Sequence, residues 1–254
     1  MILDKFGLKG KVGIVTGASR GIGHAIAVGL AEAGADLAVV GRVKETIEKA
    51  AKDVESAGRK ALAVVGDTSK EEDIRRTVGE TLKAFGRIDI LVNAAGVTAR
   101  AVAEDFPVDE WDRIMGINLR GVYLMSVAAG REMIKQQRGK IINIASMGTY
   151  VGIPNASAYV ASKGGVGQYT KNLAVEWAKY NIQVNAIAPG YIETDMTQGL
   201  KQNPDRMASI MMRTPAKRWG QPEELAGAAV FLASAASDFV TGHILDVDGG
   251  FMAG

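Results

Sequence analysis

The sequence contains no cysteine, only two histidines and no long apolar run. Without cysteine the chain has no disulfide, no thiolate nucleophile and no cysteine-ligated zinc or iron–sulfur cluster. His24 and His243 lie far apart in the sequence, which argues against a transition-metal site and against a Ser-His-Asp hydrolase. We therefore expect a protein without a bound metal.

The chain also lacks the sequence features that direct proteins to membranes. The nearest candidate for a membrane span, Leu225 to Ala236, is rich in alanine and falls short of the roughly 18 apolar residues that cross a bilayer. Met1 to Lys11 carries charged side chains with no apolar run behind them, unlike a secretory signal. We expect a cytoplasmic protein with no membrane partner.

Charge of one sign is not in excess either. The 30 lysines and arginines nearly balance the 28 aspartates and glutamates, which gives a net charge of +2 at pH 7. Adjacent basic pairs such as Arg59-Lys60 and Lys217-Arg218 are scattered along the chain. A protein that binds nucleic acid would gather its basic residues on one surface. We therefore expect no nucleic-acid partner.

The composition that is present, 47% apolar and 23% charged residues, is typical of a globular protein. Along the chain, short β-branched runs alternate with longer segments of helical periodicity. The predicted strands are 11–16, 36–40, 61–65, 88–93, 140–145, 183–188 and 243–247, and the predicted helices are 22–33, 44–57, 70–85, 108–137, 157–180 and 222–233. Gly34, Gly58 and Gly86 each follow a helical pattern, where a left-handed residue ends a helix.

This alternation predicts an α/β fold: a doubly wound, Rossmann-type parallel sheet of about seven strands with helices on both faces. The glycines are dispersed and mark no linker, and the chain has no repeat, so we predict a single domain over residues 1–254. The exception to the alternation is Thr194 to Pro222. A long segment after a sheet strand is usually a lid or a binding loop.

A glycine-rich turn directly follows the first predicted strand and opens a helix. The turn reads Thr16-Gly17-Ala18-Ser19-Arg20-Gly21-Ile22-Gly23. Glycines let the backbone approach a pyrophosphate closely, and the amide groups at the helix N-terminus stabilise its charge. The strand–turn–helix context therefore predicts a dinucleotide-binding site in preference to a tight turn without function.

Two arginines indicate which dinucleotide is bound. Arg42 ends the second predicted strand, where an enzyme selective for NAD usually carries an acid for the adenosine 2′-hydroxyl. Arg20, within the glycine turn, is a second cation that can converge on a 2′-phosphate, and each charge-assisted contact contributes about 1.5 to 3 kcal/mol. We therefore predict NADP(H) as the cofactor. The alternative is that both are solvated surface arginines.

Ser146, Tyr159 and Lys163 form a candidate catalytic group. Ser146 follows the fifth predicted strand, and Tyr159 and Lys163 stand at positions i and i+4 of a predicted helix, so they share one face. A nearby ammonium lowers the pKa of a phenol, which is near 10 when free. Tyr159 would then exchange a proton with a carbonyl or alcohol oxygen, while Ser146 hydrogen-bonds to that oxygen. For Ser146 the alternative is a strand-end hydroxyl without function.

In their order and spacing these pieces resemble the short-chain dehydrogenase/reductase family over essentially the whole chain. The matching motifs are the turn at Thr16 to Gly23, Asn93-Ala94-Ala95-Gly96, Asn118, Ser146, Tyr159-Val160-Ala161-Ser162-Lys163 and Pro189-Gly190. One departure is Ala94, where many members carry a second asparagine. The departure affects some stabilising hydrogen bonds and leaves the chemistry in place.

The resemblance implies a role for each matching residue. Tyr159 would be the catalytic acid or base, Lys163 would lower its pKa and bind the nicotinamide ribose, and Ser146 would position the substrate oxygen. Asn118 would support a water that relays protons to Lys163; the alternative is a helix kink or a buried structural amide. The residues expected to contact the cofactor are Gly17, Ser19, Arg20, Gly21, Ile22, Gly23, Arg42, Asp67 (adenine), Asn93 (adenosine), Gly96, Tyr159, Lys163, Pro189, Gly190, and Ile192 with Thr194 (nicotinamide amide).

The last third of the chain is most similar to gluconate 5-dehydrogenases and related sugar-acid or polyol dehydrogenases of that family. The similar segments are 181–185, 188–191, 213–220 and 236–243, and much of this similarity is scaffold. Arg100 follows the Asn93 to Gly96 turn, where its guanidinium can pair with a substrate carboxylate beside Ser146 and Tyr159. A surface role for Arg100 is the alternative.

The resemblance therefore implies an oxidoreductase that transfers a hydride between NADP(H) and a hydroxyl or keto group of a small-molecule substrate, a sugar acid or polyol. Reduction of a 3-oxoacyl thioester or another carbonyl is the alternative, because the core motifs are the same. A protein that binds NADP(H) without catalysis is a further alternative, against which the complete group of Ser146, Tyr159 and Lys163 argues. The family usually forms homotetramers, and we expect a homotetramer here.

Overall fold

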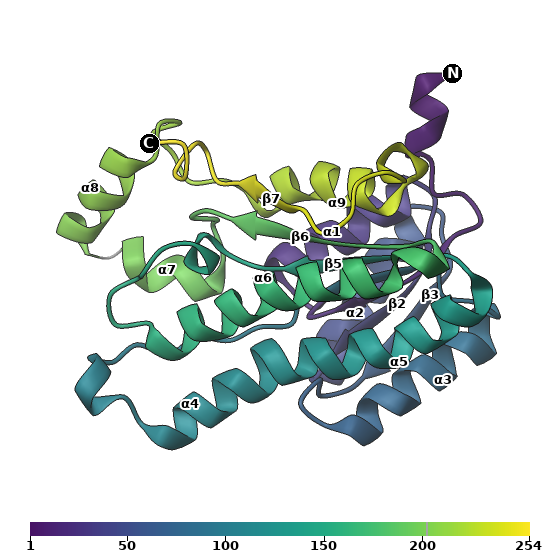
Figure 1. Ribbon diagram of the computed structural model, residues 1–254, viewed down its shortest axis with the longest axis horizontal. Helices are drawn as coiled ribbons and strands as arrows, with labels where there is room; N and C mark the ends of the chain where they lie inside the picture. Colours follow the sequence, from purple (N-terminus) through teal and green to yellow (C-terminus); the bar gives the residue numbers. More distant parts are fainter. Residues whose placement is uncertain (202) are drawn as a thin grey trace.

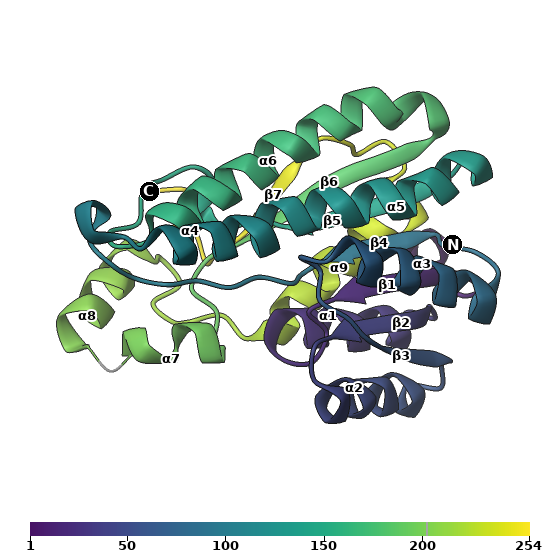
Figure 2. The same cartoon turned by 90° about the horizontal axis from the view of Figure 1, so that it is seen from below.

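Seven parallel strands form one sheet in the computed structural model, which describes residues 1–201 and 203–254. The strands are β1 (Val12–Thr16), β2 (Asp36–Gly41), β3 (Ala61–Val65), β4 (Ile90–Asn93), β5 (Gly139–Ile144), β6 (Ile182–Pro189) and β7 (Ile244–Val247). Their order across the sheet is β3-β2-β1-β4-β5-β6-β7. Figures 1 and 2 show the sheet from two sides, and all seven strands are labelled in Figure 2. The direction in which strands are added therefore reverses between β1 and β4.

Helices cover both faces of this sheet (Figures 1 and 2). One face carries α1 (Gly21–Glu32), α2 (Lys44–Ser56) and α9 (Ala226–Ala233), and the other carries α3 (Glu71–Phe85), α5 (Gly121–Gln136) and α6 (Ser157–Trp177). The helix α4 (Val108–Met115) leads through a π-helical turn, Gly116–Arg120, into α5. Both views place α7 (Asp195–Lys201) and α8 (Pro204–Arg213) together at one end of the molecule.

Apolar side chains from the central strands fill the core on both sides of the sheet. On β1, Ile14 packs with the buried residues of α3, α5 and α6, whereas the neighbouring Val15 packs with those of α1, α2 and α9. On β4, Leu91 and Val92 divide between the two faces in the same way. Because successive side chains of a strand point to opposite faces, a strand covered on both faces reads as a continuous apolar run.

The predicted fold is confirmed, and each predicted strand lies within two residues of its predicted ends. Gly34, Gly58 and Gly86 have positive φ angles of 112°, 76° and 78°, as the helix ends require. The strands of this single sheet are distributed along the chain from residue 12 to residue 247. On this ground we propose that residues 1–254 form one domain.

Two segments differ from the predicted elements. The helix predicted over 108–137 is interrupted by the π-helical turn, which contains Asn118. The segment 194–222, predicted as a lid or loop, contains α7 and α8. The second of these helices begins with a local capping signal: the Asn203 side chain accepts a hydrogen bond from the amide of Arg206, and Pro204 occupies the first helical position. None of the helices among the described residues is long and apolar enough to span a bilayer.

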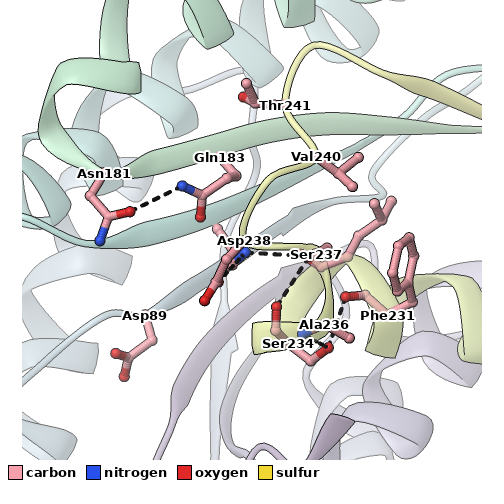
Figure 3. Close-up of polar contacts among 12 residues, drawn as sticks. Asp89, Asn181, Gln183, Phe231, Ser234, Ala236, Ser237, Asp238, Val240 and Thr241 are labelled. Atoms are coloured by element: carbon pink, nitrogen blue, oxygen red, sulfur yellow. Dashed lines mark hydrogen bonds and ion pairs between the residues drawn. The ribbon is translucent and has the colours of Figure 1, made fainter. Parts of the chain in front are cut away.

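A buried charge lies at the amino ends of the central strands. The ammonium of Lys140, on β5, is 2.9 Å from the carboxylate of Asp238 and 3.3 Å from the hydroxyl of Ser237. Burial lowers the pKa of Lys140, and Asp238 acts in the opposite direction. Figure 3 shows Ser237 and Asp238 in the turn that follows α9, where Ser237 also donates to the carbonyl of Ser234 at 3.1 Å. This turn is therefore tied to the end of the sheet opposite the carboxyl ends of the strands.

We predict that Asp238→Ala lowers the free energy of unfolding by about 1 to 3 kcal/mol, because it leaves the buried ammonium of Lys140 with Ser237 as its remaining partner. Urea denaturation measures this change. The control is Asp112→Ala, because Asp112 is exposed on α4. The double variant Lys140→Met with Asp238→Ala should regain stability, and equal losses in the single variant and the control would contradict the assignment.

Candidate active site

A cleft of about 930 Å³ opens along the carboxyl ends of the strands, on both sides of the point where strand order reverses. This crevice is where open α/β sheets bind their ligands. Its volume is at the upper end of the range of about 300 to 1,000 Å³ that is usual for ligand pockets. The lining includes the predicted residues Gly17, Ser19, Arg20, Gly21, Ile22, Gly23, Arg42, Asp67, Gly96, Ser146, Tyr159, Lys163, Pro189, Gly190, Ile192 and Thr194.

The glycine turn after β1 has no room for side chains at two of its positions. A Cβ atom on Gly17 would lie 2.8 Å from backbone atoms of Ala95, and one on Gly23 would lie 2.3 Å from the carbonyl oxygen of Gly17. Gly17 and Gly21 have positive φ angles of 66° and 57°. The turn is therefore closely packed backbone that lines the cleft and leads directly into the N-terminus of α1, an arrangement that suits a pyrophosphate.

The two arginines predicted to select the cofactor both line the cleft, and they differ in their contacts. Arg42 is exposed at the end of β2. Arg20 forms an ion pair with Asp195, at the start of α7, with 2.8 Å between Nη1 and Oδ2. Both partners are largely exposed, with side-chain exposures of 76% and 68%, so the pair is weak and open to exchange. A phosphate near Arg20 would compete with Asp195, a contact that the sequence analysis did not foresee.

Asn93 is the one predicted cofactor residue that does not line the cleft. It is buried at the end of β4, and its amide donates to the hydroxyl of Ser126 at 3.0 Å and to Asn143 at 2.8 Å. Both acceptors lie behind the cleft, on α5 and β5. The geometry therefore gives its side chain a structural role, whereas the acidic side chain of Asp67 stays at the cleft and accepts from Ser69.

The three candidate catalytic side chains meet at one end of the cleft. Ser146 follows β5, and its hydroxyl accepts a hydrogen bond from the amide of Gly148 at 3.1 Å. Lys163 is buried on α6, its ammonium 5.7 Å from the centre of the Tyr159 ring. That ammonium donates to the carbonyl of Ile144, the last residue of β5, at 2.6 Å. The end of one strand therefore fixes both Ser146 and Lys163 beside Tyr159.

Burial controls the protonation of this group. It raises the pKa of Tyr159 above its ordinary value, against smaller effects of the hydrogen bond with Ser146 and of the positive charge of Arg100. Burial also lowers the pKa of Lys163 to about 8. The structure thus differs from the expectation that Lys163 by itself makes the phenol acidic, because loss of water disfavours the phenolate and the ammonium alike.

Asn118 is fully buried in the π-helical turn between α4 and α5. Its side-chain oxygen accepts from the amide of Val97 at 2.8 Å, and its amide donates to the carbonyl of Val97 at 2.9 Å and to Ser162 at 3.1 Å. These bonds tie the π-helical turn to the segment after β4 and to α6. Asn118 does not itself line the cleft, so the role that this geometry supports directly is to position the segments around Lys163.

A smaller pocket continues from Tyr159 toward α7. Arg100, Ser146, Tyr159 and Tyr191 line it together with apolar residues that include Ile153 and Leu200. The guanidinium of Arg100 is 3.4 Å from the carbonyl oxygen of Pro154. Sequence reasoning placed Arg100 here but missed Tyr191. The signal for Tyr191 was its place directly after Pro189-Gly190 at the end of β6.

Comparisons with known proteins agree with this geometry. A family model described as enoyl-(acyl carrier protein) reductase matches residues 17–252. The 2-dehydro-3-deoxy-D-gluconate 5-dehydrogenase of Dickeya dadantii is 48% identical and covers 100% of both chains. The gluconate 5-dehydrogenase of Gluconobacter oxydans is 43% identical over 97% of this chain and 96% of its own. A crystal structure of a gluconate 5-dehydrogenase from Burkholderia cenocepacia, in complex with NADP and tartrate, is 42% identical, covers 100% of both chains and has a TM-score of 0.96.

We predict that Gly23→Ala destabilises the fold by about 1 to 3 kcal/mol, because the new methyl group overlaps the carbonyl oxygen of Gly17. Thermal denaturation measures the change. The matched control is Gly79→Ala on α3, where a Cβ has nothing within 4 Å and should stabilise the helix by about 0.4 to 1 kcal/mol. A Gly23→Ala variant as stable as its parent would show that the turn can accommodate a methyl group at this position.

Proposed function

The chain belongs to the short-chain dehydrogenase/reductase family, and on that premise we propose that it transfers a hydride between NADP(H) and a hydroxyl or keto group of a sugar acid. The observation that carries the proposal is the meeting of Ser146, Tyr159 and Lys163 at one end of a cleft lined by the glycine turn. The relatives named above are a deoxy-keto-gluconate dehydrogenase and two gluconate 5-dehydrogenases, one of them with bound NADP.

The cleft fits such a cofactor along its length. The glycine turn, closed to any Cβ at Gly17 and Gly23, would hold the pyrophosphate, and Arg42 with Arg20 would hold the 2′-phosphate. Asp67 would lie toward the adenine, and Pro189, Gly190, Ile192 and Thr194 toward the nicotinamide. The nicotinamide, when bound, supplies the hydride acceptor or donor and, in its oxidised form, a positive charge.

Tyr159 performs the proton transfer in this proposal. Its raised pKa keeps the phenol protonated at neutral pH, ready to donate to a carbonyl oxygen that becomes an alcohol. In the reverse direction the phenolate accepts the proton of the alcohol. The Ser146 hydroxyl accepts from the amide of Gly148, which orients its own O–H to donate to the substrate oxygen and to stabilise developing negative charge. Lys163, fixed by Ile144, completes the polar group and would bind the nicotinamide ribose.

Arg100 makes a sugar acid the favoured substrate class. Its guanidinium lines the smaller pocket beside Tyr159, and among the described residues it forms no ion pair with a carboxylate. It is therefore able to bind the carboxylate of a substrate whose hydroxyl reaches Tyr159. Polyols that lack the carboxylate are secondary substrates in this proposal. Reduction of 3-oxoacyl thioesters, which the same catalytic group would support, is the alternative outcome of a substrate survey.

We also propose that the protein acts in the cytoplasm as a homotetramer, by resemblance to the family. The exposed apolar side chains of Tyr123 on α5, Val175 on α6 and Phe239 before β7 support an assembly through the long helices and the last strand. Tyr123 packs edge to face on Tyr169 across α5 and α6. Mass measurement in solution tests the assembly.

We predict that Tyr159→Phe lowers kcat for a sugar acid by about 10² to 10⁴-fold, because it removes the proton donor and acceptor, while the dissociation constant for NADPH changes little. The parent should oxidise alcohols faster as pH rises, since oxidation needs the phenolate, and should lose reductase activity as pH rises through the pKa of Tyr159. The control is Tyr180→Phe, a tyrosine beside Lys179 that does not line the cleft. Undiminished activity of Tyr159→Phe would contradict the mechanism.

We predict that Arg42→Ala raises the dissociation constant for NADPH by about 10 to 100-fold, because one charge-assisted contact to the 2′-phosphate is lost, and changes that for NADH by less than about threefold. Fluorescence titration of each nucleotide measures the two constants. Arg131→Ala on the exposed face of α5 controls for net charge. Equal affinity of the parent for NADPH and NADH would remove Arg42 from this role.

A further inference from the structure

A second arginine approaches the smaller pocket from the helix α8. The guanidinium Nη2 of Arg206 is 3.4 Å from the carbonyl oxygen of Pro154, the same atom that Arg100 Nη1 contacts at 3.4 Å. The two guanidinium nitrogens therefore lie within twice that distance of each other. They come from segments far apart in the sequence, and they meet over the loop that precedes α6.

Both guanidinium groups keep most of their hydrogen-bonding capacity. Each arginine carries five N–H donors, and the shared contact at 3.4 Å is longer than the usual 2.7 to 3.2 Å of an N–H···O bond. Within residues 1–201 and 203–254, neither Arg100 nor Arg206 has an ion pair with a carboxylate. Other arginines on nearby segments, such as Arg20 with Asp195 and Arg218 with Glu224, do.

Two neighbouring positive charges without an anion repel each other. Burial lowers the pKa of Arg100, and the nearby charge of Arg206 lowers it further. Burial raises the pKa of Tyr191, and the charges of Arg206 and Arg100 oppose that rise. A carboxylate that binds between the guanidinium groups removes this repulsion, because it accepts hydrogen bonds from both and its negative charge offsets theirs. The pair therefore has the electrostatics of an anion-binding site.

The position of the pair relative to Tyr159 defines the substrate that fits. Arg100 and Tyr191 line the smaller pocket that begins at Tyr159 and Ser146, whereas Arg206 is not among its lining residues and meets Arg100 at the carbonyl oxygen of Pro154. Arg206 does not line the pocket that Tyr159 and Ser146 line, so a carboxylate held between Arg100 and Arg206 is expected to lie apart from the oxygen that Tyr159 protonates.

We propose that Arg206 of α8 is a specificity-determining residue that binds the substrate carboxylate jointly with Arg100, so that the enzyme prefers acids that react at a carbon remote from the carboxylate. The inference rests on the proposed function, since it assigns a second residue to the carboxylate of the sugar acid. It also gives α8 a role in substrate recognition.

The test compares two substrates that differ only at the carboxylate: D-gluconate and D-glucitol, which carries CH₂OH in place of the carboxylate. The measured quantity is the ratio of kcat/KM for gluconate to kcat/KM for glucitol, with NADP as the cofactor. For Arg206→Ala we expect this ratio to fall by about 10 to 100-fold, mainly through KM for gluconate, as for the loss of one charge-assisted hydrogen bond. Arg206→Lys should recover part of the loss.

Two further measurements separate binding of the carboxylate from a structural effect of Arg206. Met212→Ala, at an exposed position of the same helix, should leave the ratio as in the parent. In a double-mutant cycle, the effects of Arg100→Ala and Arg206→Ala on the ratio should be non-additive if both bind one carboxylate. A role limited to holding α8 against Pro154 would lower kcat/KM for both substrates alike and leave the ratio unchanged, which overturns the inference.

Failure of the proposed function would look different. If the parent reduces 3-oxoacyl thioesters and turns over neither gluconate nor its keto forms, the sugar-acid function is wrong and the inference falls with it. If the parent oxidises gluconate and Arg206→Ala keeps the parental ratio, the proposed function stands and only the role of Arg206 is wrong.

Discussion

Close approach of two backbone segments at the reversal of strand order is the constraint on which the rest of the structure depends. Thr16 ends β1 opposite Asn93 of β4, and its hydroxyl accepts hydrogen bonds from the amides of Ala94 and Ala95 at 3.1 and 3.2 Å. Gly17 then passes so near Ala95 that no side chain fits between them. At this point the floor of the cleft is therefore closely packed backbone, with no side chain between the two segments.

Short turns after strands line one end of the cleft, whereas longer segments and a helix line the other end. The nucleotide end is built from the first half of the sheet, where short turns after β1 and β2 hold Arg20 and Arg42. The proposed substrate end is built from the segment after β4, the loop before α6 and the helix α7. The ion pair of Arg20 with Asp195 joins the two ends, since Asp195 opens α7. In the proposed function a 2′-phosphate at Arg20 would compete with the Asp195 carboxylate for one guanidinium, and cofactor binding would then influence α7.

Much of the fold could be predicted from the sequence, because its strands are continuous apolar runs and its helix ends carry glycines with positive φ. The spacing of Tyr159 and Lys163 places them on one helix face, and the surrounding motifs were needed to single out this pair. The contact of Lys163 with Ile144 and the burial of Asn93 could not be predicted, because both depend on how β5 packs against its neighbours. The predicted pKa of Tyr159 had the wrong direction for the same reason. Spacing places a cation beside the phenol, whereas only the packing reveals how much water both groups lose.

That reversal of pKa direction bears on how the catalytic group is assembled. Burial disfavours the charged forms of both Tyr159 and Lys163, so an ion pair between them is not what assembles the group. Two of its members, Lys163 and Ser146, are held instead by backbone groups at and after the end of β5: Ile144 accepts from Lys163, and the amide of Gly148 orients the Ser146 hydroxyl. These contacts persist when Lys163, with its pKa of about 8, gains or loses its proton, because an amine donates to a carbonyl in either state. The geometry needed for proton transfer is therefore set by one strand end and does not depend on the charge state of the group that it positions.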